Sequence, residues 1–175
     1  MKICIVSDSH DNARLLLAAV EAARIHGAEA VLHCGDVIGS ITLRPLLKLV
    51  LPMHVIHGNN LGDPAALYGL AAKSQGLIRY HGPDADIQIG GRRIFLVHYP
   101  HYGRAFAATG DFDLVWFGHS HVAAITEQPN LKGGTTWLVN PGTVAGLSAP
   151  ATYAVGDSPA RLTAAGSCPT TIAMV

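Results

Sequence analysis

Short runs rich in β-forming residues alternate with helical patterns over the first two-thirds of the chain, and this alternation constrains the fold most. The expected strands and helices cover, in alternation, residues 2–6, 12–26, 30–34, 41–50, 53–57 and 64–73. Asn12 can cap the first of these helices, and Gly27 can end it. Strands that alternate with helices predict βαβ units, and therefore a parallel or mixed sheet.

After residue 76 the pattern becomes mainly β. Residues 85–89 and 92–97 flank Gly90-Gly91 and predict a hairpin, and a helix near 102–109 leads to a strand ending at Phe117. Further strands are expected at 122–127, 135–140, 152–156 and 161–165. An α/β first half joined to an antiparallel second half predicts two sheets packed face to face with helices outside. We expect a single domain covering residues 1–175.

The composition favours an ordered protein and disfavours several functions. Apolar residues make up 49% of the chain and charged residues 14%, so a large core is expected. The 12 basic and 12 acidic residues balance, which disfavours binding nucleic acid through bulk charge. No apolar run has the length of a membrane span, and no signal peptide is evident.

The cysteines indicate a reducing compartment. None of the three forms a CxxC pair, and Cys4 and Cys34 belong to predicted strands, where buried free thiols are the ordinary explanation. A soluble, cytoplasmic protein without a membrane partner is therefore expected.

Residues that can coordinate a metal directly follow five predicted strands. In chain order they are Asp8, His10, Asp36, Asn59, His98, His119 and His121. Ligands of open α/β sheets bind beyond the carboxyl ends of the strands, so these seven side chains are expected to converge. His119 and His121 stand two positions apart, which in extended backbone places both side chains on one side.

The types of donor indicate which metals the site accepts. Two carboxylates, one amide and four imidazoles without a thiolate suit Mn, Fe, Co, Ni or Zn better than Ca or Mg. Seven ligands are too many for one catalytic ion with open positions, but they suit two ions that share a carboxylate.

Each donor also has a simpler structural explanation. Asp8 and Asp36 could be turn or N-cap residues, and Asn59 could occupy a left-handed turn. His33, His54 and His57 fall inside predicted strands and are expected in the core or as hydrogen-bond partners of the ligands. His26 and His81 are expected in exposed loops.

The ordered series of motifs resembles the calcineurin-like metallophosphoesterase superfamily. It consists of Asp8-x-His10, Gly35-Asp36, Gly58-Asn59, His98 and Gly118-His119-x-His121. The short chain and the "NPGTV" segment at 140–144 are similar to the small YfcE-type phosphodiesterase branch, and the resemblance spans residues 3 to about 156. It implies a four-layer α/β/β/α sandwich of two mixed sheets, with the metal site at the carboxyl ends of the strands.

The resemblance also implies how two divalent metals are held. Asp8, His10, Asp36 and His121 would bind the first, and Asp36, Asn59, His98 and His119 the second. Manganese is expected first, with Fe, Ni, Co or Zn open. Two cations about 3.5–4 Å apart lower the pKa of a bridging water, so hydroxide can attack a phosphoester near neutral pH. Asp36, Asn59 and His98 would act in catalysis through that water.

One segment departs from the superfamily pattern. Many members have Gly-Asn-His followed by an acidic residue, where the histidine assists the leaving group, whereas this chain has Gly58-Asn59-Asn60-Leu61. Asn60 is not an acid at physiological pH. His101 could donate the proton or contact phosphate instead, although a surface role is the simpler explanation, and Arg104 has the same status.

Two functions follow from this interpretation, and a dinuclear hydrolase acting on a bond other than a phosphoester also stays open. The first is a phosphoesterase acting on small phosphodiesters or phosphomonoesters, with diesters favoured. The second is a non-catalytic scaffold that binds a partner protein, as the retromer subunit of the same fold does. Presence of all seven donors favours the enzyme. The natural substrate, the physiological metal and assembly into a homo-oligomer stay open.

Overall fold

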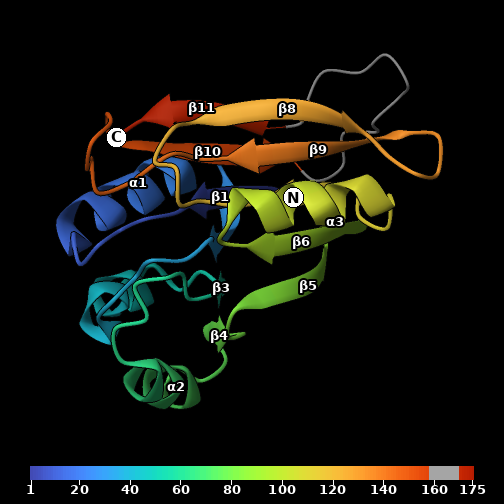
Figure 1. Ribbon diagram of the computed structural model, residues 1–175. Helices are drawn as coiled ribbons and strands as arrows, with labels where there is room; N and C mark the ends of the chain where they lie inside the picture. The colour runs from blue at the N-terminus through green and yellow to red at the C-terminus, as the bar shows by residue number, and fades with distance from the viewer. Residues whose placement is uncertain (158–169) are drawn as a thin grey trace.

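Two mixed β-sheets pack face to face in the computed structural model, which describes residues 1–157 and 170–175 (Figure 1). The first has the strand order β11-β10-β1-β2-β3-β4 and the second β5-β6-β7-β9-β8. The first sheet contains β1 (Lys2–Val6), β2 (Ala28–His33), β3 (Met53–Val55), β4 (Ile78–Tyr80), β10 (Thr152–Asp157) and β11 (Thr170–Met174). The second contains β5 (Asp84–Ile89), β6 (Arg92–Val97), β7 (Leu114–Trp116), β8 (Ala124–Pro129) and β9 (Thr135–Asn140).

Helices cover the outer face of each sheet. They are α1 (Ala13–Ile25), the 3-10 helix η1 (Ser40–Leu49), α2 (Pro64–Lys73) and α3 (Pro100–Thr109). Buried residues of α1, η1 and α2 share one apolar cluster with the first sheet, and Ala107 of α3 shares another with the second sheet. The predicted α/β/β/α arrangement is therefore confirmed, and Figure 1 shows α3 alone in front of β6.

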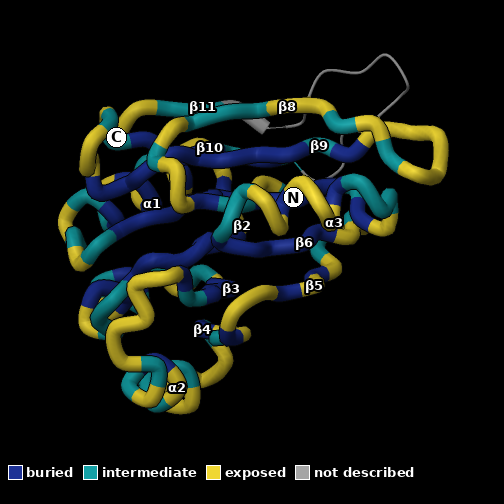
Figure 2. Tube along the Cα trace, in the orientation of Figure 1, coloured by how far each residue is buried: buried dark blue, intermediate teal, exposed yellow. Residues whose placement is uncertain are grey.

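Alternation of side chains along the strands builds this layering. In β1, Cys4 and Val6 face the helices, whereas Ile3 and Ile5 face the second sheet. Because successive side chains of a strand point to opposite faces, a central strand that is apolar throughout must be covered on both sides. Figure 2 shows that central strands such as β6 and β9 are largely buried, whereas β8 and much of the helices and loops are more exposed.

The expected antiparallel second half is wrong in two respects. β6, β7 and β9 run parallel to one another, because α3 carries the chain back to the same end of the sheet before β7. β10 and β11 join the first sheet instead, through antiparallel pairing of β10 with β1. The strand expected at 161–165 lies outside the described residues.

Several local predictions need smaller corrections. The helix expected at 41–50 forms as a 3-10 helix around Pro45, which has no backbone N–H to donate and disfavours α-helical backbone in the residue before it. Helix α3 begins at Pro100, earlier than residue 102, with proline at its first position. The strands β4 and β11 were not predicted.

Cys4 and Cys34 are buried free thiols, as expected. Within residues 1–157 and 170–175, every helix is too short or too polar to cross a membrane.

Candidate metal centre

All seven predicted donors lie at the carboxyl ends of strands from both sheets. The first sheet supplies Asp8 and His10 after β1, Asp36 after β2 and Asn59 after β3, and the second supplies His98 after β6 and His119 and His121 after β7. The parallel direction of β1, β2 and β3, and of β6 and β7, places these loops at one edge of the sandwich. The expected convergence of these seven side chains is therefore present in the structure.

One half of the cluster is built around Asp8. Its Oδ1 atom lies 3.3 Å from His121 Nε2 and 3.9 Å from His10 Nε2. The two imidazole Nε2 atoms lie 3.3 Å apart. Asp8, His10 and His121 thus offer ligand atoms that all lie within 4.8 Å of one another, a spacing at which they could hold one metal ion.

The other half is built around His98. Its Nε2 atom lies 3.4 Å from Asp36 Oδ1 and 3.1 Å from Asn59 Oδ1, and Asn59 Oδ1 is also 2.8 Å from His119 Nδ1. The second oxygen of Asp36, Oδ2, lies 3.6 Å from His10 Nε2 in the first half. Each oxygen of the Asp36 carboxylate therefore faces one half of the cluster, as a shared carboxylate would.

Hydrogen bonds orient two of the imidazoles. His98 Nδ1 donates to the carbonyl of Cys34 at 2.8 Å, and His121 Nδ1 donates to the carbonyl of Leu147 at 2.9 Å. In a neutral imidazole this leaves the lone pair on Nε2, which in both residues faces the carboxylates. This second hydrogen bond is the usual way in which a protein fixes the tautomer of a metal-binding histidine.

The buried carboxylates fit a cation. Asp8 is fully buried and Asp36 is nearly so. Among the described residues Asp8 Oδ1 has no hydrogen-bond partner. An unpaired buried carboxylate oxygen is costly, and a bound cation would remove that cost.

Five of the seven donors have left-handed backbone. The φ angles of Asp8, His10, Asp36, His119 and His121 lie between +40° and +70°. Non-glycine residues seldom adopt positive φ, and such positions are concentrated at functional sites. The turn interpretation is thus correct for the backbone of Asp8 and Asp36, but neither caps a helix, because Asn12 caps α1 and Gly39 precedes η1. Asn59 has no left-handed φ.

Glycines let the loops approach the donors closely. A Cβ atom on Gly58 would collide with Asp36 Oδ1 and with His98 Nε2. A Cβ on Gly118 would collide with Ser7 Oγ and lie 2.6 Å from Asp8 Oδ2. These contacts explain why glycine precedes a donor at both positions.

The other candidate residues lie in three different places. Asn60 binds Asp36 twice, since its Nδ2 donates to Oδ2 at 2.6 Å and its backbone N–H donates to Oδ1 at 3.0 Å. His101 is exposed at the start of α3, with its ring 4.1 Å from that of Tyr102. Arg104 is exposed and lines a groove between α3 and β8 that extends to Ser120, beside the donor cluster rather than in it.

Three further histidines in or next to the first sheet differ in what they contact: His54 and His57 contact residues away from the donors, whereas His33 contacts a donor loop. His54 Nδ1 lies 2.9 Å from His81 Nε2, and His57 Nδ1 contacts the hydroxyl of Tyr80. Of the two expected positions, His54 takes the one in the core, since its side chain is buried, and the hydrogen bonds of His54 and His57 go to His81 and Tyr80 rather than to a donor. His33 Nε2 contacts Ser9 Oγ at 3.0 Å, and burial lowers the pKa of His33 to about 3, so this imidazole is neutral.

Sequence reasoning did not foresee how residues 140–145 support the donor loops. Asn140 Nδ2 donates to the carbonyl of Gly118 at 3.0 Å, and Thr143 Oγ1 donates to the carbonyl of Asp8 at 2.9 Å. The backbone N–H of Ala145 also donates to Asp8 O. Asn140 and Thr143 belong to the "NPGTV" segment, so this motif was the feature of the sequence that could have predicted the support of the donor loops.

A four-layer sandwich with carboxylates and imidazoles at its strand ends is the architecture of a metal-dependent phosphoesterase. Residues 1–160 match the family model described as the calcineurin-like phosphoesterase superfamily domain, and the chain belongs to that superfamily.

The chain is also similar, in sequence or in fold, to individual proteins. The chain is 26% identical over 150 residues to phosphodiesterase MJ0936 of Methanocaldococcus jannaschii, covering 83% of this chain and 86% of the relative. The structure of an archaeal phosphodiesterase superposes with a TM-score of 0.86 at 22% identity over the whole of both chains. YfcE, a phosphoesterase from E. coli, has a TM-score of 0.62 at 19% identity, covering 90% of this chain and 88% of YfcE.

Proposed function

We propose that this protein is a phosphodiesterase that uses two divalent metal ions to hydrolyse small phosphodiesters. The observation that carries the proposal is the position of Asp36, whose two carboxylate oxygens face His10 on one side and His98 on the other. A carboxylate shared in this way is what a dinuclear centre requires.

The residues present suit two cations. Asp8, His10, Asp36 and His121 would hold one, and Asp36, Asn59, His98 and His119 the other. Bound divalent metals supply an activated water and positive charge for the phosphate oxygens. Manganese is the first candidate, with Fe, Co, Ni and Zn as alternatives, because oxygen and imidazole donors accept all of them.

The chain offers little help to a leaving group. Asn60 is an amide, and both of its hydrogen bonds go to Asp36, so it positions this carboxylate rather than donating a proton. His101, exposed at the start of α3, is the remaining candidate for a proton donor. Esters whose leaving groups need no proton should therefore be the better substrates, which supports diesters with acidic alcohols or phenols.

The test is hydrolysis of bis(p-nitrophenyl) phosphate by metal-stripped protein, with Mn, Ni, Zn or Mg added back separately. We expect turnover to return with at least one ion and to fall at least about a hundredfold in Asp36→Asn, in line with losses seen when metal centres are disturbed. Asp111→Asn is the control, because this exposed carboxylate pairs with Lys132 near the opposite end of β7.

A different outcome would favour the scaffold. If the protein binds metal measurably but no ion restores turnover, the phosphodiesterase proposal is refuted and a partner protein should be sought.

A further inference from the structure

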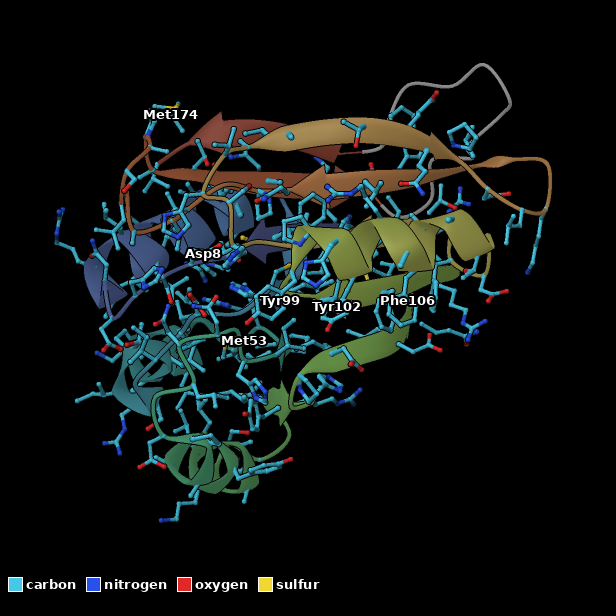
Figure 3. The ribbon with its side chains drawn as sticks, in the orientation of Figure 1. Asp8, Met53, Tyr99, Tyr102, Phe106 and Met174 are labelled. Atoms are coloured by element: carbon cyan, nitrogen blue, oxygen red, sulfur yellow. The ribbon has the colours of Figure 1, made fainter. Side chains whose placement is uncertain are left out.

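A pocket of about 140 Å³ opens beside the donor cluster, between the edges of the two sheets. His98 belongs to both the pocket and the donor cluster, and Gly58, which also lines the pocket, lies against Asp36 and His98, so the pocket adjoins the cluster. The opposite wall comes from Tyr99 and Tyr102, at the start of α3. Figure 3 shows these two tyrosines on the side of α3 that faces the labelled Met53 of β3. We call this space the ring pocket.

Aromatic rings supply most of the side chains of the ring pocket. The ring of Tyr99 lies 5.5 Å from that of His98 and 5.9 Å from that of Tyr102, in both cases edge to face. His57 adds a fourth ring, held by its contact with Tyr80. Because these rings meet edge to face, some of their faces and edges stay free to contact one more aromatic ring. Aromatic rings pack favourably against one another in edge-to-face and offset-stacked arrangements.

The negative charge in the lining disfavours binding of a phosphate group inside the ring pocket. Asp84 is the one carboxylate in the lining, and none of the described residues that line the pocket is a lysine or arginine. A phosphate group would be repelled by Asp84 and attracted by the cations in the donor cluster. The ring pocket therefore suits an uncharged part of the substrate, next to a phosphate bound at the metals.

The size of the ring pocket matches one aromatic ring. Its volume is about 140 Å³, and an apolar cavity of ~150 Å³ is known to hold benzene. Tyr102 is 51% exposed, so one wall of the pocket is open to solvent. A ring attached to a phosphate at the metals can therefore enter from the side without displacing buried side chains.

We propose that the ring pocket binds the aromatic ring of one ester group of the substrate, and so makes this protein a hydrolase of aryl or nucleoside phosphodiesters. This inference rests on the proposed function, because it needs phosphate at the metal centre. Tyr102 and Tyr99 select the ring, and Asp84 selects against negative charge on it.

The experiment compares phosphonates bound to manganese-loaded protein by calorimetry, a measurement that needs no turnover. Benzylphosphonate carries a methylene in place of the ester oxygen, cyclohexylmethylphosphonate replaces its aromatic ring by a saturated one, and methylphosphonate has no ring. We expect benzylphosphonate to bind on the order of tenfold more tightly than methylphosphonate, as stacking of one ring on aromatic side chains allows. Cyclohexylmethylphosphonate should recover only part of this gain.

Variants of Tyr102 assign the gain to the ring pocket. Tyr102→Ala should bring the affinity for benzylphosphonate close to that for methylphosphonate, whereas Tyr102→Phe, which keeps the ring, should retain the preference. Two results would refute the proposal that the ring pocket binds an aromatic ring. One is equal affinity for the benzyl and cyclohexylmethyl compounds, and the other is a preference for benzylphosphonate over methylphosphonate that survives in Tyr102→Ala. If methylphosphonate also fails to bind, the proposed phosphodiesterase function is refuted, and the inference about the ring pocket, which depends on it, is refuted as well.

The charge of Asp84 provides a separate test. We expect 4-carboxybenzylphosphonate to bind more weakly than benzylphosphonate, and Asp84→Asn to recover much of that difference. Because Asp84 lies at the start of the exposed edge strand β5, this substitution should leave the fold intact. An unchanged difference in Asp84→Asn would contradict the assignment of the ring to this pocket.

Discussion

Asn60 departs from a pattern that is common in the superfamily and still contacts the donor cluster. The superfamily often has a histidine at this position, and the amide here cannot donate a proton to a leaving alkoxide. It holds both oxygens of Asp36 instead, through its side chain and its backbone N–H. The amide at this position therefore fixes the Asp36 carboxylate, and a proton for a leaving group would have to come from another residue.

A second residue-scale feature, the contact at Gly58, leads to a prediction about metal binding. Gly58→Ala should place a methyl group against Asp36 and His98, and we expect metal affinity to fall about 10–100-fold, as when supports of metal ligands are lost. Calorimetric titration of the stripped protein with manganese measures this directly.

The matched control is Gly69→Ala in α2, where the added methyl group would meet nothing within 4 Å. Because alanine favours helix over glycine, this variant should be more stable by about 0.5–1 kcal/mol with unchanged metal affinity. Equal metal affinity in the two variants would show that the close approach at Gly58 does not matter for the centre.

Sequence reasoning succeeded where structure is local and periodic. The strands up to residue 57, helix α1 with its Asn12 cap and the hairpin around Gly90-Gly91 follow from patterns of neighbouring residues. The seven candidate donors stand out in the sequence because each follows a predicted strand.

It failed where pairing between distant segments decides the structure. The three-residue strand β4 is too short to show a period, and it forms because β3 offers an edge to pair with. Likewise, β10 pairs with β1 across the length of the chain, which no local pattern reveals. The hydrogen bonds from residues 140–145 to the donor loops belong to the same class of long-range contact.

At the scale of elements, the pair formed by His54 of β3 and His81 after β4 predicts a pH-dependent stability. Burial lowers the pKa of His54 to about 4, from an ordinary value of 6.5. The unfolded chain therefore takes up this proton at higher pH than the folded protein does. The stability that the neutral His54 provides should be fully present above pH 6.5 and be lost progressively as the pH falls from 6.5 toward 4.

Denaturant unfolding of the metal-free protein at several pH values measures this loss. His54→Gln should reduce the dependence on pH in that window by about 1–3 kcal/mol, because the change of pKa from 6.5 to about 4 sets an upper limit of roughly 3.4 kcal/mol that solvent screening lowers. His26→Gln, which changes an exposed histidine at the end of α1, is the control and should follow the unchanged protein. Parallel curves for His54→Gln and the unchanged protein would contradict the prediction.

At the scale of the whole molecule, metal ions should stabilise the fold. Asp8 Oδ1 is buried without a hydrogen-bond partner among the described residues, and the donors come from both sheets. A ligand that binds only the folded state adds about 2.7 kcal/mol when its free concentration is 100 times its dissociation constant. We therefore expect a manganese-dependent rise in Tm that chelation reverses.

The Asp36→Asn variant serves as the comparison for this measurement, because it removes the charge shared by the two halves of the cluster. Its Tm should respond to manganese much less than that of the unchanged protein. A Tm that is independent of manganese in the unchanged protein would mean that the seven donors do not bind the ion.

The division of the donors between two sheets also bears on the order of folding. A chain in which only the first sheet has formed holds Asp8, His10, Asp36 and Asn59, and it lacks the three histidines of the second sheet. The complete centre exists only after the two sheets dock. Metal ions should therefore bind only after the rate-limiting step of folding. They should slow the unfolding of the native protein and leave the rate of its folding almost unchanged.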